Sequence, residues 1–255
     1  MVNGPAIAIA QLADVRLFAD PEAKHLGVQT ARTFQAVLER IRQLEPQPHL
    51  LQLAGNLSQD ETPESYRNLY KLLSPLGIPT YWLAGDRDSL PLMAKTLSGP
   101  PFSSNKSLQL GRWHLILLST NVPGRQEGWL SATSLDWLDK QLELAGDRSV
   151  AIVLHHPPFR VGSDWLDRTR LQNPDDFFAV IDRLGEQVRL VFCGHVCQNA
   201  EYKREDTRYF TIPSTGVQFE PGTSECVPDT APPAFRLSRF YPDGGWDTKV
   251  VWVKN

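Results

Sequence analysis

The sequence lacks long hydrophobic runs and contains few cysteines. No apolar stretch approaches the ~20 residues that a membrane-spanning helix requires, so we expect no membrane span. The segment MVNGPAIAIAQLADVR has no basic part and only a five-residue apolar run before Gln11, which predicts no signal peptide. The three cysteines, Cys193, Cys197 and Cys226, are not spaced as a disulfide framework and indicate a reducing compartment. Together these absences predict a cytoplasmic protein.

The sequence also lacks a strong excess of charge of either sign. Its 26 lysine and arginine residues and 29 aspartate and glutamate residues leave a formal net charge of −3. This near-balance gives no general attraction to nucleic acid or to an anionic membrane, so we expect no nucleic-acid partner. Internal repeats, low-complexity tracts and an evident linker are missing too. The chain is therefore predicted to form one domain over residues 1–255, long enough to bury a substantial core.

Short apolar, β-branched runs are present and alternate with segments of helical period. Several of these runs are almost wholly apolar, as expected of strands that are buried on both faces. The runs predict nine strands, at residues 7–12, 50–54, 80–84, 114–119, 150–154, 188–193, 209–212, 235–240 and 249–253.

Apolar stripes between these runs predict amphipathic helices. One stripe runs from Phe34 to Leu44, a second from Tyr66 to Leu73, and a third from Leu135 to Leu142. A fourth helix is predicted over residues 174–184, with Asn173 as its N-cap, a proline at its first position and acidic residues in its first turn. The order β-α-β-α-β, followed by a strand-rich end, predicts a layered α/β protein with sheets inside and helices outside.

Polar residues capable of chemistry follow five of the predicted strands. In α/β proteins ligand sites form where strand ends converge, so these residues are predicted to share a site. Each motif alone could be a turn or a cap, but together they offer carboxylate, amide, imidazole and thiol groups, which are ligands for divalent transition metals. The motifs are Asp14-Val15-Arg16, Gly55-Asn56, Gly85-Asp86-Arg87-Asp88, His155-His156-Pro157-Pro158 and Gly194-His195-Val196-Cys197.

These five motifs resemble the D-x-H, G-D, G-N-H-D/E, H-x-P and G-H-x-H motifs of the calcineurin-like metallophosphoesterases. The stretches LSQDETPESY, HHPPF, VGSDWLD, LQNPDDFFAVIDR, CGHVCQ and IPSTGVQFEP resemble the bacterial class III 3′,5′-cyclic-AMP phosphodiesterases. The resemblance implies an α/β fold, specifically a four-layer α-β-β-α sandwich. It also implies two metal ions, usually Fe or Mn, at the strand ends and hydrolysis of a phosphoester by in-line attack of an activated water.

The chain departs from this family pattern at most of the positions that matter. Asp14, His155 and His195 keep their places as ligands. Five other positions differ: Arg16 stands in place of a histidine ligand, Asn56 in place of the metal-bridging aspartate, Asp86 in place of an asparagine ligand, Arg87 in place of the catalytic histidine, and Cys197 in place of the last histidine ligand.

The loss of the bridging carboxylate weighs most against a two-metal centre. Two dications 3.5–4 Å apart repel by roughly 20 kcal/mol at an effective dielectric of 20, and the neutral amide of Asn56 cannot offset this charge. An arginine side chain cannot be a ligand, and a guanidinium about 4 Å from a dication costs on the order of 8 kcal/mol. We therefore expect the second site, which retains Asp14 and Cys197, to stay empty.

The other site keeps Asp86, His155 and His195, with Asn56 as a weak fourth ligand, and could hold one Mn, Fe or Zn ion or none. Without metal, the two acids of the pocket are balanced by Arg16 and Arg87. These two guanidinium groups could instead bind a phosphate. Arg87 is then the only candidate at the catalytic histidine position, and it is not an obvious proton donor.

Three functions remain open on the sequence alone. The departures from the family pattern favour the first, a pseudoenzyme without a working two-metal centre that retains the fold to bind a phosphate-bearing small molecule, such as a nucleotide, or a protein partner. The second is an active metal-dependent phosphodiesterase or phosphatase that works with a single metal on a cyclic nucleotide or another phosphoester. The third is a structural subunit of a larger assembly.

Overall fold

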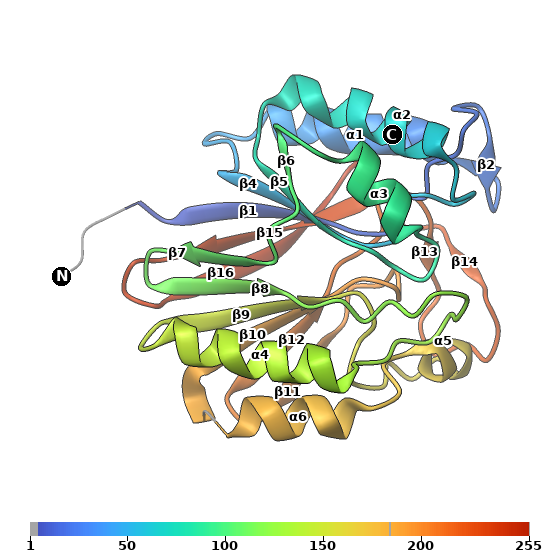
Figure 1. Ribbon diagram of the computed structural model, residues 1–255. Coiled ribbons are helices and arrows are strands. Elements are labelled where there is room, and N and C mark those ends of the chain that lie inside the picture. Colours follow the sequence, from blue (N-terminus) through green and yellow to red (C-terminus); the bar gives the residue numbers. More distant parts are fainter. Residues whose placement is uncertain (1–4, 184, 255) are drawn as a thin grey trace.

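The computed structural model describes residues 5–183 and 185–254. The start of the N-terminal segment, residues 1–4, and Leu184, the expected last residue of the fourth helix, lie outside the described residues. Two six-stranded sheets lie face to face in the middle of the molecule, with helices on the outer face of each (Figure 1). This arrangement confirms the four-layer α-β-β-α sandwich.

The first sheet, sheet 1, carries the N-terminal strands and both C-terminal strands. Strands β1, β4, β5 and β6 run parallel to one another, and β15 pairs antiparallel with both β1 and β16. The order across the sheet is β16 (Trp246–Trp252), β15 (Ala234–Phe240), β1 (Ile7–Leu12), β4 (Leu50–Ala54), β5 (Thr80–Leu83) and β6 (Phe102–Ser103).

The second sheet, sheet 2, is built from the middle of the chain. Its strands β8, β9, β10 and β12 are parallel, and the two edge strands β7 and β11 are antiparallel to their neighbours. The order is β11 (Glu201–Arg204), β12 (Thr207–Thr211), β10 (Val188–Cys193), β9 (Ser149–Leu154), β8 (Trp113–Leu117) and β7 (Ser107–Leu110).

Helices cover the outer face of each sheet, and two short hairpins lie near the carboxyl ends of the parallel strands (Figure 1). Sheet 1 is covered by α1, α2 and α3, and sheet 2 by α4 and α6. The helices are α1 (Thr30–Arg42), α2 (Pro63–Leu73), α3 (Leu90–Thr96), α4 (Ala132–Ala145), α5 (Asp164–Thr169) and α6 (Pro174–Asp182), with 3₁₀ turns at Ser74–Leu76 and Gly185–Gln187. The hairpins are β2 (Lys24–His25) with β3 (Val28–Gln29) and β13 (Gln218–Phe219) with β14 (Pro228–Asp229).

Three apolar layers hold the sandwich together. One fills the space between sheet 1 and its helices and includes Phe34 and Leu53. Another fills the space between sheet 2 and its helices and includes Leu138 and Phe177. The third lies between the two sheets and includes Leu115. Because the central strands are buried on both faces, only the loops at their ends can offer side chains to a ligand.

Local signals explain where the helices begin. Thr62 caps α2, since its side chain accepts a hydrogen bond from the Ser65 N–H at 3.1 Å, and Pro63 follows at the first helical position. Asn173 occupies the predicted N-cap position of α6, but its side chain makes no capping hydrogen bond to the main chain of that helix. Its side chain pairs instead with both the N–H and the C=O of Leu130, just before α4. Among the described residues, no helix is long and apolar enough to cross a membrane.

Candidate metal and phosphate site

The loops that follow β1, β4, β5, β9 and β10 come together at one end of the two sheets. Hydrogen bonds join the sheets there, and two of them involve residues of these loops. The His195 N–H donates to Asp14 Oδ2 at 2.9 Å, and His155 Nδ1 lies 2.6 Å from the Ala54 carbonyl oxygen. The structure therefore gathers all five motifs that the sequence singled out.

Asn56 lies between the two acids of the site. Its amide Nδ2 donates to Asp14 Oδ1 at 3.0 Å and to Asp86 Oδ1 at 2.9 Å, while its Oδ1 accepts the Arg87 N–H at 2.9 Å. The amide thus joins the acids as a hydrogen-bond donor, at the place where the family pattern has a bridging carboxylate. Its oxygen is turned to the main chain, so the role of Asn56 as a fourth metal ligand stays a prediction.

Asp86, His155 and His195 direct their ligand atoms at one point. Asp86 Oδ1 is 3.2 Å from His155 Nε2 and 3.4 Å from His195 Nδ1. Burial alone would raise the pKa of Asp86, but the adjacent imidazoles of His155 and His195 hold that pKa far below its usual range. Asp86 is therefore a carboxylate at any physiological pH, and a metal that bound here would displace a proton from its histidine partner.

The outer ring nitrogens of both histidines are fixed by other groups. His155 Nδ1 donates to the Ala54 carbonyl, which leaves Nε2 to face Asp86, and His195 Nε2 lies 2.8 Å from Thr169 Oγ1 on α5. Such contacts set the tautomer and the ring orientation of a metal-ligating histidine. Among the described residues, the buried His195 Nδ1 has no hydrogen-bond partner.

His156 lies beside these ligands but is engaged elsewhere. Asp86 and the three histidines place their ligand atoms within 4.8 Å of one another. However, His156 Nε2 donates to the Gln126 carbonyl at 3.0 Å and its Nδ1 pairs with Thr120 Oγ1 at 2.8 Å. Burial lowers the pKa of His156 well below its usual value, so the ring is neutral and holds the Gln126 loop in place.

Arg16 covers the second acid of the site. Its guanidinium lies 3.1 Å from Asp14 Oδ1 and also donates to Gln59 Oε1 at 2.9 Å. The adjacent Cys197 is fully buried, and burial raises the pKa of its thiol well above the usual value. A neutral thiol is a poor metal ligand, and Arg16 brings a positive charge to the carboxylate that a second metal would need.

Arg87 projects into the opening of the site. Its Nε lies 3.4 Å from Asp86 Oδ2, yet 40% of its side chain is exposed. It lines a cavity of about 190 Å³ that also contains Arg16, Asp86 and His195. A terminal amino group of Arg87 is thus placed to contact an anion that enters the cavity.

Asp88, the second acid of the β5 loop, has a structural role that the sequence did not reveal. It is buried and accepts hydrogen bonds from the main-chain N–H groups of Leu57, Ser58 and Gly85 and from the Tyr66 hydroxyl. These bonds tie the β4 loop to the β5 loop, and so they position Asn56 and Asp86. The one signal for this role in the sequence was that a second acid, Asp88, stands two positions after Asp86.

The main chain of the site is unusual as well. Residues other than glycine rarely adopt a positive φ, because this conformation costs roughly 1–2 kcal/mol per residue. Five site residues have one: Asp14 (50°), Arg16 (52°), Asn56 (53°), His195 (69°) and Cys197 (51°). The strain persists because the hydrogen bonds between the loops hold each residue in place.

Asp86, His155 and His195 could hold a divalent metal ion. The donor set of two imidazoles and a carboxylate is one that Zn²⁺, Mn²⁺ and Fe²⁺ accept. Glycines also surround His155: a Cβ at Gly55 would lie 2.5 Å from His155 Nδ1, and a Cβ at Gly85 would lie 2.7 Å from His155 Nε2. Two features therefore suit a bound ion: His195 Nδ1 has no hydrogen-bond partner among the described residues, and the glycines let the loops pack closely around the His155 ring.

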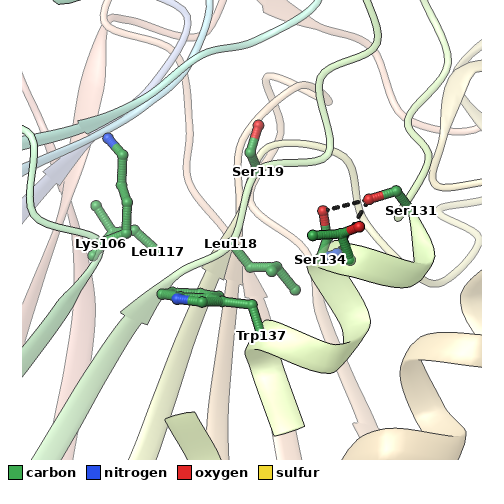
Figure 2. Close-up of a pocket in the computed structure, with 8 residues that line it drawn as sticks. Lys106, Leu117, Leu118, Ser119, Ser131, Ser134 and Trp137 are labelled. Atoms are coloured by element: carbon green, nitrogen blue, oxygen red, sulfur yellow. Dashed lines mark hydrogen bonds between the residues drawn. The ribbon is translucent and has the colours of Figure 1, made fainter. Parts of the chain in front are cut away.

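A second cavity, of about 310 Å³, lies between the end of β8 and the start of α4, and it carries no such ligand set. Figure 2 shows Trp137 and Leu118 forming an apolar floor, with the Ser131 and Ser134 hydroxyls hydrogen-bonded to each other on one side. The Lys106 side chain points away from these serines. Its ammonium donates to the Trp82 carbonyl and lies 3.6 Å from the centre of the Trp82 ring.

Lys106 gives the protein a predicted pH dependence of stability. Burial lowers the pKa of its ammonium from 10.5 to about 8. Between these values the unfolded chain binds a proton that the folded protein has released, so stability should rise with pH in that window. The cation–π contact with Trp82 offsets part of the effect. From pH 7 to pH 10, the stability of the wild type should rise relative to Lys106→Met by about 1–3 kcal/mol. Urea unfolding at both pH values measures this, and a constant difference would refute it.

Comparisons with known proteins place this geometry in context. The sequence model of the calcineurin-like phosphoesterase family matches residues 7–199. A 3′,5′-cyclic-nucleotide phosphodiesterase of Nostoc sp. is 43% identical over 247 residues, which cover 97% of this chain and 92% of that protein. A 3′,5′-cyclic adenosine monophosphate phosphodiesterase of Pseudomonas aeruginosa is 33% identical, covering 98% of this chain and 93% of that protein.

The fold is shared more widely than the sequence. A dimetal phosphatase from Danio rerio superposes with a TM-score of 0.67 at 14% identity, covering 98% of this chain and all of that one. The curated relatives are phosphodiesterases, and the site contains a group of residues that could hold a metal. These findings do not support the expectation of a pseudoenzyme, and they fit the alternative of an active phosphodiesterase better.

Proposed function

The chain belongs to the calcineurin-like phosphoesterase family, and from this premise we propose that it is an active phosphodiesterase that hydrolyses a cyclic nucleotide with a single divalent metal ion. The observation that carries the proposal is the convergence of Asp86 Oδ1, His155 Nε2 and His195 Nδ1 on one point. The similarity to relatives named as cyclic-nucleotide phosphodiesterases supports the choice of substrate class.

Each residue has a distinct task in this proposal. Asp86, His155 and His195 would hold the metal, which supplies Lewis-acid polarisation of the phosphoryl group and lowers the pKa of water. Thr169 and the Ala54 carbonyl keep the two imidazoles in the orientation that the ion requires.

Arg87 would bind the phosphoryl group itself. A guanidinium has donors in a planar fork that matches two phosphoryl oxygens, and it stabilises the negative charge that grows in the transition state. It cannot deliver a proton, because its pKa is too high. The leaving oxygen of the ester would therefore take its proton from water, and we expect a lower turnover than a site with a histidine at this place would reach.

Elemental analysis of the purified protein, combined with hydrolysis of 3′,5′-cyclic AMP in the presence of Mn²⁺, tests the proposal. We expect one metal ion per chain, turnover that disappears after chelation, and recovery when Mn²⁺ is added back. Bis(p-nitrophenyl) phosphate serves as a generic phosphodiester in parallel. A protein that binds the metal yet cleaves neither ester would contradict the proposal, as would turnover that survives complete removal of metal.

A further inference from the structure

The cavity beside the metal ligands has a chemically mixed lining. Part of it is made by the charged and ligating groups Arg16, Asp86, Arg87 and His195. Another part is made by less polar side chains from three distant segments: Leu26, Trp165, Phe219 and Cys226. This mixed lining suits a molecule that carries an anionic group together with a flat or apolar group.

The aromatic part of the lining is made by Trp165 on α5 and Phe219 on β13. Their ring centres are 4.9 Å apart and the rings are perpendicular at 89°. In this edge-to-face geometry the rim of one ring meets the face of the other. Trp165 also packs against a small buried cluster formed by Cys197, Val217 and Phe219. The two rings thus pack against each other and in this cluster, and both line the cavity.

The hairpin of β2 and β3 supplies another part of the lining. Leu26 lies at the hairpin tip and is 48% exposed, while His25 beside it lines the cavity as well. Burial, with the positive charges of Arg16 and Arg87, lowers the pKa of His25 to about 4. His25 is therefore neutral under physiological conditions and adds no positive charge to that of the two arginines.

Helix α5 links the aromatic part of the lining to the candidate metal ligands. Trp165 and Thr169 are four residues apart, and residues with this spacing lie on the same face of a helix. Both line the cavity, and Thr169 Oγ1 lies 2.8 Å from Nε2 of the metal-ligand candidate His195. One turn of helix thus fixes the distance between the aromatic wall and the ligand set.

We propose that Trp165 and Phe219 form a base-binding wall, on which the nucleobase of the substrate stacks while its phosphate lies between Arg87 and the metal ligands. This proposal rests on the proposed function, and it deepens it by stating how a nucleotide is distinguished from a base-free phosphodiester. Every nucleobase presents a flat π-face, and stacking on an aromatic side chain strengthens binding by roughly tenfold to a hundredfold. The wall thus supplies selectivity for nucleotides without requiring a particular base.

The test compares ligands that differ only in the base. Calorimetry with the metal-loaded protein measures the binding of adenosine 5′-monophosphate and of ribose 5-phosphate to the wild type, Trp165→Ala and Trp165→Phe. We expect the wild type to prefer the nucleotide by tenfold or more, Trp165→Ala to lose that preference, and Trp165→Phe to retain most of it. The matched control is Trp129→Ala, because Trp129 is 47% exposed and lies outside the cavity lining.

Hydrolysis assays separate this inference from the proposed function. The substrates are 3′,5′-cyclic AMP and the 3′,5′-cyclic phosphate of methyl riboside, which lacks a base. Equal kcat/KM values for both in the wild type would overturn the base-binding wall and leave the phosphodiesterase standing. Cleavage of neither would overturn the proposed function, while Trp165-dependent nucleotide binding would still support the wall. Equal losses of both ligands in Trp165→Ala would show that Trp165 is only structural and would overturn the inference.

Discussion

His155→Ala should reduce the hydrolysis of cyclic AMP by about a thousandfold and release the bound metal. The substitution removes the ligand atom Nε2, which lies 3.2 Å from Asp86 Oδ1. It also removes the ring that the Ala54 carbonyl holds from the opposite sheet. With two ligands left, the site would lose most of its affinity, since each metal ligand contributes a large share of the binding free energy.

The control for this variant is His49→Ala, at the opposite end of β4. His49 is an exposed histidine that accepts a hydrogen bond from the Ala8 N–H, so its removal makes the same chemical change far from the site. Metal content is measured by elemental analysis and turnover by release of AMP, both at equal helical content. If His155→Ala kept its metal and more than a tenth of the wild-type rate, the assignment of His155 as a ligand would be wrong.

The second large effect is expected from restoring the family pattern. The combined variant Arg16→His, Asn56→Asp, Asp86→Asn, Arg87→His and Cys197→His should bind a second metal ion. It removes Arg16 from Asp14, which that guanidinium now contacts at 3.1 Å. It also places a carboxylate at position 56, where a shared anion can offset the roughly 20 kcal/mol of repulsion between two dications.

Titration with Mn²⁺, followed by elemental analysis, measures the outcome. We expect about two ions per chain in the restored protein and about one in the wild type, with turnover raised at least tenfold because a histidine can again protonate the leaving group. The control variant carries Asn56→Asp alone. It should gain little, because Arg16 still covers Asp14. A folded restored protein that takes up no more metal than the wild type would show that the backbone, and not these five side chains, limits occupancy.

Much of the fold could be predicted from hydrophobic runs alone. The bounds of β1, β4 and β10 agree with the prediction residue for residue, because buried parallel strands are apolar throughout and their ends are sharp. The edge strands β7 and β11 were not predicted, since SLQL and EYKR are short and none of their residues is buried. Short edge strands carry no clear hydrophobic pattern, and only pairing with a neighbour defines them. The single domain over residues 1–255 stays a prediction.

The site was predictable as a set of loops but not as a set of contacts. The motifs could place Asp86 near His155 because both follow parallel strands, but they could not show that His156 uses both of its ring nitrogens elsewhere. Nor could they show which way the Asn56 amide is turned. Trp165 was missed as a cavity residue because it lies on α5, well beyond the motif that directly follows the end of β9. Such roles depend on distances between segments that are far apart in sequence.

The left-handed main-chain conformation of the site residues is held partly by bonds that do not depend on the charge of their side chains. Main-chain hydrogen bonds that do not depend on these side chains help to hold the loops: the Asp14 N–H donates to the Gly55 carbonyl and the Arg16 N–H to the Asn56 carbonyl. Exchanging a side chain there changes the charge of the pocket while these bonds remain. A few substitutions in this one scaffold could therefore give a two-ion hydrolase, a one-ion hydrolase or a protein that only binds anions.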